Sequence, residues 1–514
     1  MKLKPTDEQQ AVIECKFDPT DIIRVLAMAG TGKTATLIMF AGFYPNSRIL
    51  YISFGKAIQL EAVERFKGTS VVCKTSHSLA YAKFGSKYQT KLVPSLKLKT
   101  LATALSIKDW DTLKYIYQTV MNFIMSADPK IIAKHVPAEA KNLIAITKAN
   151  LLDKGFDLDL DAPTEAAKGP GIVKQAESLW QRMCDVRDLE IGMLHDGYLK
   201  LWQLSNPKLP YDIILLDEFQ DTNSTVADVF IKQDCVRVMV GDMHQRIFGF
   251  RQTANSLSGI KPNHEFYLTK SFRFGQRVGD LASLILKQFK GETHRVIGLN
   301  GDGLIQPVDK SKQFTIITRT NAMLFGKAAG LYRNNRLAFI GGVEKYRFSD
   351  ILDTYYLWAN MRNSIKDSYI RSFASFDEME EYSKVTDDRE LQSRSIIVKV
   401  YKDQIPRLID DITRLAVTPD RADITLTNTH QVKGLEFEQV QLADDYTELV
   451  IKNDAGTLEL VDKTELSLEE LNLIYVALTR AKRVLEINKN MVSFLELTGN
   501  THLMAPYKGL DKND

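Results

Sequence analysis

Residues 22–38 read IIRVLAMAGTGKTATLI, a run of apolar residues that leads into a turn with two glycines, a lysine and a threonine. The β-branched run 22–28 predicts a buried strand, and the residues after the turn predict a helix. A strand that enters a helix through such a turn presents backbone N–H groups to phosphate. In this loop Lys33 reaches the β- and γ-phosphate oxygens and Thr34 binds Mg²⁺. The generic pattern has glycine at Ala27, but the strand and helix around the loop favour a phosphate site.

An acidic pair supplies the second half of this site. Asp217 and Glu218 follow four apolar residues in IILLDEFQD, residues 213–221. They therefore lie at the end of a buried strand, beside the glycine-rich loop, where a carboxylate can hold a metal ion and its neighbour can orient water. We assign Asp217 to Mg²⁺, directly or through water, and Glu218 to water activation. These two motifs predict a P-loop nucleoside triphosphatase.

Similar apolar runs, separated by helical patterns, predict an α/β protein with two parallel sheets. The expected strands of the first sheet are at 22–30, 48–54, 211–218 and 236–242, and those of the second are at 314–320, 337–342, 422–430 and 484–490. A stretch rich in helix formers, 85–195, interrupts the first sheet, and a charged helical stretch, 353–420, interrupts the second.

The composition is that of a folded multidomain protein, with 514 residues, 44% of them hydrophobic, and a net charge of +3. A nucleic-acid site must therefore come from local clustering of charge. MKLKPTDEQQ, residues 1–10, lacks the apolar core of a signal peptide, and no stretch reaches roughly 18 apolar residues. We expect no membrane partner, and a cytoplasmic location that becomes nuclear if the protein is eukaryotic. Four widely separated cysteines argue against a zinc site or a disulfide framework.

Five further motifs follow the P-loop in order: DEFQDTN (217–223), GDMHQRIFGFRQTA (241–254), LTKSFRFG (268–275), THQVKGLEF (429–437) and NLIYVALTRAK (472–482). Together the six motifs resemble those of the UvrD/Rep-type superfamily 1A DNA helicases. Within that group, CKTSHSLAY (73–81), HDGYLKLWQLS (195–205) and ADDY (443–446) resemble the helicase region of the F-box DNA helicases. We expect no F-box, and no F-box-mediated ligase partner, because the first predicted strand begins at residue 22.

The resemblance implies two RecA-like P-loop domains with parallel sheets, each carrying a helical insertion. The expected divisions are domain 1A at 1–84 and 196–262, insertion 1B at 85–195, domain 2A at 263–352 and 421–514, and insertion 2B at 353–420.

The resemblance also implies which residues bind ATP. Gln9 matches the glutamine that reads the adenine edge with an amide donor and acceptor, with neighbouring Gln10 as the alternative register. Phe272 matches the aromatic that stacks on adenine, and Glu436 matches the residue that contacts ribose. The phosphate loop comprises Ala29, Gly30, Thr31, Gly32, Lys33 and Thr34.

Three residues match those that act on the γ-phosphate. Gln245 matches the γ-phosphate sensor, and Arg273 and Arg480 match two arginines whose planar guanidinium groups bind phosphate oxygens bidentately. In this family ATP closes a cleft between the two sheet domains and hydrolysis lets it open. An arginine finger in P-loop enzymes contributes about 10³ to 10⁵ in rate.

For the DNA track, the resemblance implies aromatic residues that stack on single-strand bases without reading their sequence. These are Phe54, Phe248 and Phe250. Candidate backbone or relay contacts are His77, Arg251, His430 and Lys433.

The leading hypothesis is an ATP-dependent helicase that translocates 3′→5′ on single-stranded DNA and separates duplexes, in DNA repair, recombination or replication. One alternative is a translocase that strips proteins such as recombinase filaments from DNA. Another is a DNA-stimulated ATPase switch or loading factor. The expected partners are single-stranded DNA, 3′-tailed duplex DNA, and recombination or repair proteins.

Overall fold

The computed structural model describes residues 4–53, 55–138, 140, 171–247, 259–385, 388–453 and 455–504. The chain forms two compact units. The first comprises Met1–Ala27, Lys33–Met243 and Phe248–Tyr267, and the second comprises Met28–Gly32, His244–Ile247 and Leu268–Asp514. Two short loops, 28–32 and 244–247, therefore belong to the second unit although the first unit continues on both sides of each.

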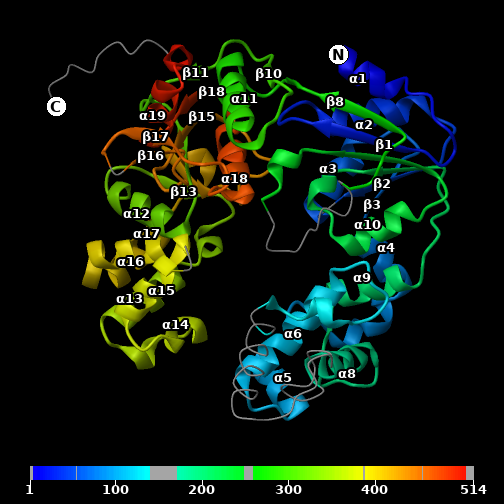
Figure 1. The fold of residues 1–514 in the computed structure, drawn as a ribbon, viewed down its shortest axis with the longest axis horizontal. Helices are drawn as coiled ribbons and strands as arrows, with labels where there is room; N and C mark the ends of the chain where they lie inside the picture. Colours follow the sequence, from blue (N-terminus) through cyan, green and yellow to red (C-terminus); the bar gives the residue numbers. More distant parts are fainter. Residues whose placement is uncertain are drawn as a thin grey trace. The chain divides into compact units, whose positions relative to one another are not determined.

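The first unit is built on a six-stranded sheet with the order β3-β2-β6-β7-β1-β8 (Figure 1). Its strands are β1 (Ile22–Ala27), β2 (Ile49–Ser53), β3 (Val72–Thr75), β6 (Ile213–Leu216), β7 (Val236–Gly241) and β8 (His264–Leu268). The neighbours from β3 to β1 pair in parallel. Strands β2, β6 and β7 are buried along their whole length, which explains why their sequences are mostly apolar. The carboxyl ends of these parallel strands share one edge of the sheet.

The helices of the first unit fall into two groups. Those next to the sheet strands in the chain are α1 (Asp7–Ile13), α2 (Lys33–Phe43), α3 (Lys56–Arg65), α4 (Ser76–Lys83), α9 (His195–Leu204) and α10 (Ser224–Ile231). The others, α5 (Leu98–Leu105), α6 (Trp110–Ile124) and α8 (Ile172–Cys184), share an apolar core with α9. Helix α9 also contacts α10, so the apolar core of α5, α6, α8 and α9 is continuous with the helices that flank the sheet.

The second unit contains a six-stranded sheet with the order β11-β18-β15-β12-β14-β13. Its strands are β11 (Leu304–Ile305), β12 (Phe314–Thr318), β13 (Leu337–Phe339), β14 (Ile424–Asn428), β15 (Phe437–Leu442) and β18 (Ala481–Glu486), and all neighbours pair in parallel. The helices next to these strands in the chain are α11 (Gln276–Lys290), α12 (Asn321–Leu331), α18 (Leu468–Leu478) and α19 (Lys489–Leu497).

A helical bundle in the second unit lies beside strands β13 and β14 (Figure 1). It comprises α13 (Phe348–Trp358), α14 (Ser368–Ser372), α15 (Phe376–Val385), α16 (Arg389–Tyr401) and α17 (Ile405–Leu415). Its apolar residues form one core with the strands, since Ile351, Leu391 and Ile412 belong to the same cluster as Phe339 and Leu426. The bundle is therefore packed onto the sheet and shares its core.

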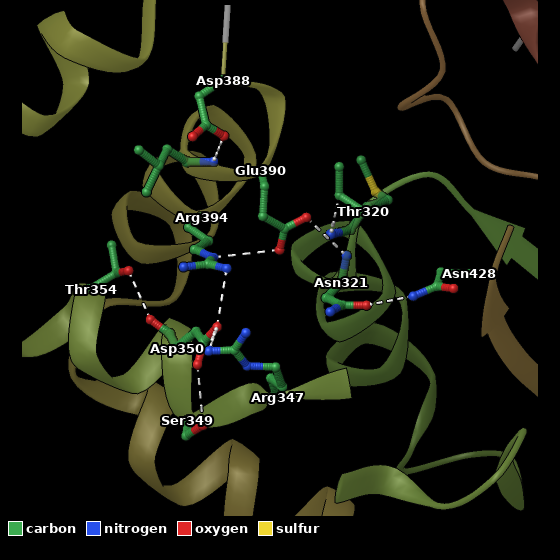
Figure 2. Close-up of polar contacts among 12 residues, drawn as sticks. Thr320, Asn321, Arg347, Ser349, Asp350, Thr354, Asp388, Glu390, Arg394 and Asn428 are labelled. Atoms are coloured by element: carbon green, nitrogen blue, oxygen red, sulfur yellow. Dashed lines mark hydrogen bonds and ion pairs between the residues drawn. The ribbon is translucent and has the colours of Figure 1, made fainter. Parts of the chain in front are cut away.

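A network of ion pairs and hydrogen bonds fastens this bundle to the strand ends (Figure 2). Arg394 on α16 pairs with Asp350 on α13 at 3.2 Å and with Glu390, one turn earlier, at 3.4 Å. The other Glu390 oxygen accepts the backbone N–H of Asn321 at the start of α12. The Asn321 side chain in turn accepts a hydrogen bond from Asn428 at the end of β14, at 2.7 Å.

The predicted fold class is confirmed, and a strand lies within or overlaps every predicted strand segment. Of the strands in the two six-stranded sheets, β3, β8, β11 and β15 were not predicted. Strand β15 carries Glu438, Gln439 and Gln441 among its apolar residues, so its sequence lacks a buried-strand pattern. Strand β8 extends the first sheet beyond the boundary predicted at residue 262.

Among the described helices, none has the length and apolar character that crossing a membrane requires. The four cysteines are free thiols; Cys15, Cys73 and Cys235 are buried, and Cys184 is partly exposed.

Candidate active site

Lys33 begins helix α2 and faces an acidic cluster in the first unit. Its Nζ lies 3.1 Å from Glu218 Oε2. Burial disfavours the charged lysine, but attraction to Glu218, Asp242 and Asp217 outweighs this effect and raises the pKa of Lys33. The lysine is therefore charged at neutral pH, with three carboxylates around a single ammonium group.

Asp217 follows β6 and is almost fully buried. Its Oδ2 accepts hydrogen bonds from the hydroxyls of Thr34, at 3.0 Å, and Tyr51, at 2.6 Å. Its Oδ1 accepts the backbone N–H of Glu218 at 2.8 Å. Burial and the neighbouring Glu218 charge raise the pKa of Asp217. Burial and the same two carboxylates raise the pKa of Tyr51, so its hydroxyl keeps its proton and donates.

The donor set fits Mg²⁺. Thr34 and Asp217 offer a hydroxyl and a carboxylate oxygen within hydrogen-bond distance, and Mg²⁺ in P-loop proteins takes such oxygens together with water and substrate phosphate. Since Lys33 faces three carboxylates, a divalent cation would also offset the excess of negative charge.

Glu218 has a left-handed backbone conformation, with φ 52° and ψ 45°. This conformation is uncommon for residues other than glycine, and such residues concentrate at functional sites. Its carboxylate is held by Lys33 and by the amide of Gln220, whose own oxygen accepts the backbone N–H of Asp242 at 3.0 Å. The end of β7 lies so close to Gln220 that a Cβ at Gly241 would be 2.3 Å from Gln220 Oε1, so this position requires glycine.

Gln9 anchors helix α1 to helix α2. Its backbone and side chain form a capping box with Thr6, and its Nε2 donates to Thr36 Oγ1 at 3.1 Å. Thr36 lies one turn after Lys33 on α2, so Gln9 is held next to the helix that begins the phosphate site. Its role in reading adenine remains a prediction.

A second group of predicted residues meets in the second unit. Arg480 is fully buried, and its guanidinium donates to the carbonyls of Val476 and Leu435 at 2.9 and 3.1 Å. Its Nη2 also lies 3.3 Å from Gln245 Oε1. Lys433 donates to the carbonyl of Gln245 at 2.6 Å. The predicted γ-phosphate sensor and one predicted arginine are therefore in direct contact.

Arg273 lies beside this group. Its Nε is 3.1 Å from Glu436 Oε2, and its Nη1 donates to the carbonyl of Thr479, next to Arg480 in the chain. The predicted ribose contact, Glu436, is thus paired with the second predicted arginine. Four residues from four separate motifs, Gln245, Arg273, Glu436 and Arg480, form one connected cluster.

Gly30 of the predicted phosphate loop packs closely against strand β9 (Lys270–Ser271) and the residues after it, and this contact leaves no room for a side chain. Gly30 has φ +74°, and a Cβ there would lie 2.5 Å from Ser271 Oγ and 2.6 Å from Arg273 Cβ. The Gly30 carbonyl accepts the backbone N–H of Phe272, whose ring is 46% exposed. An exposed ring beside a phosphate loop is available for stacking on a base.

The backbone N–H of Ala29 donates to the hydroxyl of Tyr475 at 2.9 Å. Tyr475 is buried on α18, the helix that ends just before Thr479 and Arg480. The phosphate loop is thus hydrogen-bonded to the helix that leads to the buried arginine.

Three of the predicted DNA contacts, His77, His430 and Lys433, lie among the described residues. His77 Nε2 is 3.0 Å from Asp196 Oδ1, and both residues line a cavity of about 380 Å³ that also reaches Asp217. Burial, together with the nearby Arg319, lowers the pKa of His430 to about 4, so this imidazole is neutral at pH 7. Phe54, Phe248, Phe250 and Arg251 lie outside the described residues.

Sequence reasoning did not identify Tyr51, Gln220, Asp242 or Tyr475. The signal for Tyr51 was a phenol in the middle of the apolar run ILYIS, because a buried tyrosine hydroxyl needs a partner. Gln220 stands two residues after Glu218, and Asp242 directly follows β7. Both positions place polar side chains at the same edge of the sheet.

Comparison with known proteins identifies two domains. Residues 5–258 match the UvrD/REP helicase N-terminal domain, and residues 350–491 match the UvrD-like helicase C-terminal domain. The chain is 33% identical to F-box DNA helicase 1 of Gallus gallus, in an alignment that covers 99% of this chain and 51% of that protein. It is 30% identical to F-box DNA helicase protein 1 of Schizosaccharomyces pombe, over 96% of this chain and 58% of that protein.

A more distant relative is the probable DNA helicase II homolog of Mycoplasma genitalium. It is 22% identical over 95% of this chain and 86% of its own length. The chain therefore spans somewhat more than half the length of the two F-box DNA helicases, and most of the length of the bacterial relative.

Proposed function

Because the chain belongs to the UvrD-like helicase family, a resemblance its motifs had indicated, we propose that it is an ATP-dependent DNA helicase that translocates 3′→5′ on single-stranded DNA. Helicases of this family use ATP, usually with Mg²⁺. The observation that carries the proposal is the cluster of Lys33, Thr34, Asp217 and Glu218, in which Lys33 contacts Glu218 and Thr34 contacts Asp217 within hydrogen-bond distance.

In this proposal each residue of the cluster has a distinct task. Lys33 binds the β- and γ-phosphates, and Thr34 and Asp217 hold Mg²⁺, which supplies charge neutralisation at the phosphates when bound. Glu218 orients and polarises the attacking water. Its constrained backbone and its bonds to Lys33 and Gln220 support a carboxylate held in one place for that purpose.

The cluster in the second unit supplies the remaining nucleotide contacts. We assign Arg273 and Arg480 to the γ-phosphate, Gln245 to sensing that phosphate, Glu436 to ribose, and Phe272 and Gln9 to adenine. The contact of Arg480 with Gln245 and of Arg273 with Glu436 supports their acting together. Substitution of one residue in either pair should change the orientation of its partner, because hydrogen bonds are directional.

The DNA track is assigned to residues of both units. We propose that His77 and His430 contact the DNA backbone, and that Phe54, Phe248, Phe250 and Arg251 supply stacking and phosphate contacts. A neutral His430 would contact DNA by hydrogen bonding and would not add positive charge at pH 7. The division into domains 1A, 1B, 2A and 2B belongs to the same proposal, with domain 1A continuing past residue 262 to include strand β8.

Two relatives are DNA helicases of the eukaryotes Gallus gallus and Schizosaccharomyces pombe, which favours action on DNA, a nuclear location and a role in repair or recombination. A translocase that removes proteins from DNA with little unwinding is the second candidate. It would use the same ATP site, so the helicase and the protein-removing translocase can be distinguished only by whether DNA strands separate or bound proteins are released.

The test uses three duplexes, with a 3′ tail, a 5′ tail or blunt ends, and a single strand whose biotinylated end holds streptavidin. The proposal predicts ATP-dependent strand separation of the 3′-tailed duplex alone. Streptavidin release without strand separation would favour the second candidate. Strand separation of the 5′-tailed duplex would contradict the assigned direction. ATP hydrolysis without strand separation or streptavidin release would contradict the motor function.

A further inference from the structure

Tyr51 lies on β2, the second strand from one edge of the first sheet, and is fully buried. It lies in the middle of β2, opposite Cys73 on β3 and Leu215 on β6. A tyrosine ring in such a position contributes apolar surface, but its hydroxyl must find a hydrogen-bond acceptor because water is excluded. The acceptor is Asp217 Oδ2, at 2.6 Å.

The surroundings of Tyr51 fix where this hydroxyl lies. Strand β2 pairs on both sides, and the Tyr51 ring packs against Phe66, with 5.1 Å between ring centroids. A side chain held in this way cannot turn to another acceptor without disturbing the sheet. The packing of the core therefore fixes the Tyr51 hydroxyl next to Asp217.

Asp217 receives three hydrogen bonds, and the one from Tyr51 is the shortest. The hydroxyls of Tyr51 and Thr34 share Oδ2, and the backbone N–H of Glu218 binds Oδ1. Thr34 is itself a proposed metal ligand. Of the two side-chain donors to Asp217, Tyr51 is the one outside the phosphate loop and the acidic motif. Hydrogen bonds to an ionised carboxylate are stronger and more directional than neutral ones.

We propose that Tyr51 is a positioning residue that holds the Asp217 carboxylate in the orientation that Mg²⁺ needs when it binds with the nucleotide. This inference rests on the proposed function, which places Mg²⁺ at Asp217. Tyr51 itself touches neither nucleotide nor metal. Its removal should therefore weaken the contribution of the metal to nucleotide binding and leave metal-free binding unchanged.

The test compares the parent with Tyr51→Phe, which keeps the ring and removes the hydroxyl. The affinity for a fluorescent ADP derivative is measured with Mg²⁺ and again with EDTA. We expect the affinity in EDTA to stay within about twofold of the parent and the gain from Mg²⁺ to fall about tenfold, the effect of losing one charge-assisted hydrogen bond.

Tyr88→Phe is the matched control. Tyr88 is also a buried tyrosine of the first unit, and its hydroxyl donates to the carbonyl of Cys184 at 2.9 Å. Both variants should lose a similar amount of thermal stability, whereas only Tyr51→Phe should lose the gain from Mg²⁺. In an Asp217→Asn background, Tyr51→Phe should have little further effect on that gain, because both changes act on one contact.

Two results would overturn the inference alone. One is a full Mg²⁺ gain in Tyr51→Phe, and the other is an equal loss of affinity with and without Mg²⁺, which would indicate a structural role. A parent protein that binds the nucleotide no better with Mg²⁺ than with EDTA would contradict the proposed metal site, and this inference with it.

Discussion

Two clusters of charged side chains, one in each unit, are balanced in different ways. In the first unit Lys33 faces the carboxylates of Glu218, Asp242 and Asp217. In the second unit two arginines, Arg347 and Arg394, pair with two carboxylates, Asp350 and Glu390 (Figure 2). These four side chains of the second cluster carry equal numbers of opposite charges, with Asp367 a further 4.0 Å from Arg347, whereas in the first cluster three carboxylates act on one lysine.

The difference agrees with a structural role for the second cluster and with the catalytic role proposed for the first. Balanced ion pairs with satisfied hydrogen bonds can hold helices together, as those between α13, α16 and the start of α12 do. A surplus of buried negative charge is costly unless a cation offsets it, so the first cluster is suited to a metal ion with a bound substrate. Breaking the first cluster should therefore affect chemistry, and breaking the second should affect stability.

The largest effect is expected for Lys33→Ala. It removes the one ammonium group of the first cluster, so ATP hydrolysis should fall by at least about 10³-fold. Thermal stability should fall as well, because the change leaves Glu218 without its ion-pair partner, so hydrolysis is compared per folded molecule. Steady-state ATP hydrolysis and a melting curve measure both quantities; near-normal hydrolysis in a folded variant would contradict the phosphate-site assignment.

Arg480→Ala should lower turnover by about 10²- to 10³-fold and also reduce stability by about 1 to 3 kcal/mol, because it leaves buried carbonyl groups without their donor. Arg273→Ala is the matched comparison. Its side chain is less buried than that of Arg480, so it should lower turnover with a smaller loss of stability. Losses confined to ATP affinity in both variants would assign these arginines to ground-state binding.

Glu218→Gln should slow hydrolysis by about 100-fold while ATP and Mg²⁺ still bind, since the amide keeps the shape but cannot polarise water. The protein should then remain bound to single-stranded DNA in the presence of ATP. Filter binding with labelled DNA and separate nucleotide titration test this. If Glu218→Gln loses ATP binding as severely as Lys33→Ala, the two residues do not have separate roles.

The smallest effect on catalysis is expected for Arg394→Ala in the balanced cluster. Removing this arginine leaves Asp350 and Glu390 without a buried partner, which should cost about 3 to 5 kcal/mol of stability. ATP hydrolysis per folded molecule should be unchanged. Arg347→Ala removes an exposed partner of the same Asp350, so chemical denaturation should register a loss of about 1 kcal/mol or less. A catalytic defect in folded Arg394→Ala would contradict the distinction between the clusters.

The fold could be predicted from sequence where strands are fully buried. Strands β1, β6, β7, β12 and β14 are mostly apolar or β-branched and largely buried, and these were found. Strands β3 and β15 could not be recognised in this way, because their polar residues leave no apolar run and their place depends on neighbours distant in the sequence.

The same limit applies to the candidate site. Motif order pointed to Lys33, Asp217, Arg273 and Arg480, because each stands in a recognisable stretch. Tyr51 stands in a strand that reads as pure core, and its contact with Asp217 spans 166 residues. Such a contact follows from the register of β2 against β6, which no local pattern specifies.

The most direct test of the central claim is the rate of Mg²⁺-dependent ATP hydrolysis with and without a single-stranded oligonucleotide. We predict that the oligonucleotide stimulates hydrolysis by the parent protein, and that omission of Mg²⁺ or the Lys33→Ala change removes the stimulated rate. Absence of Mg²⁺-dependent hydrolysis, or the same rate with and without the oligonucleotide, would contradict the assignment of this protein as a DNA-dependent motor.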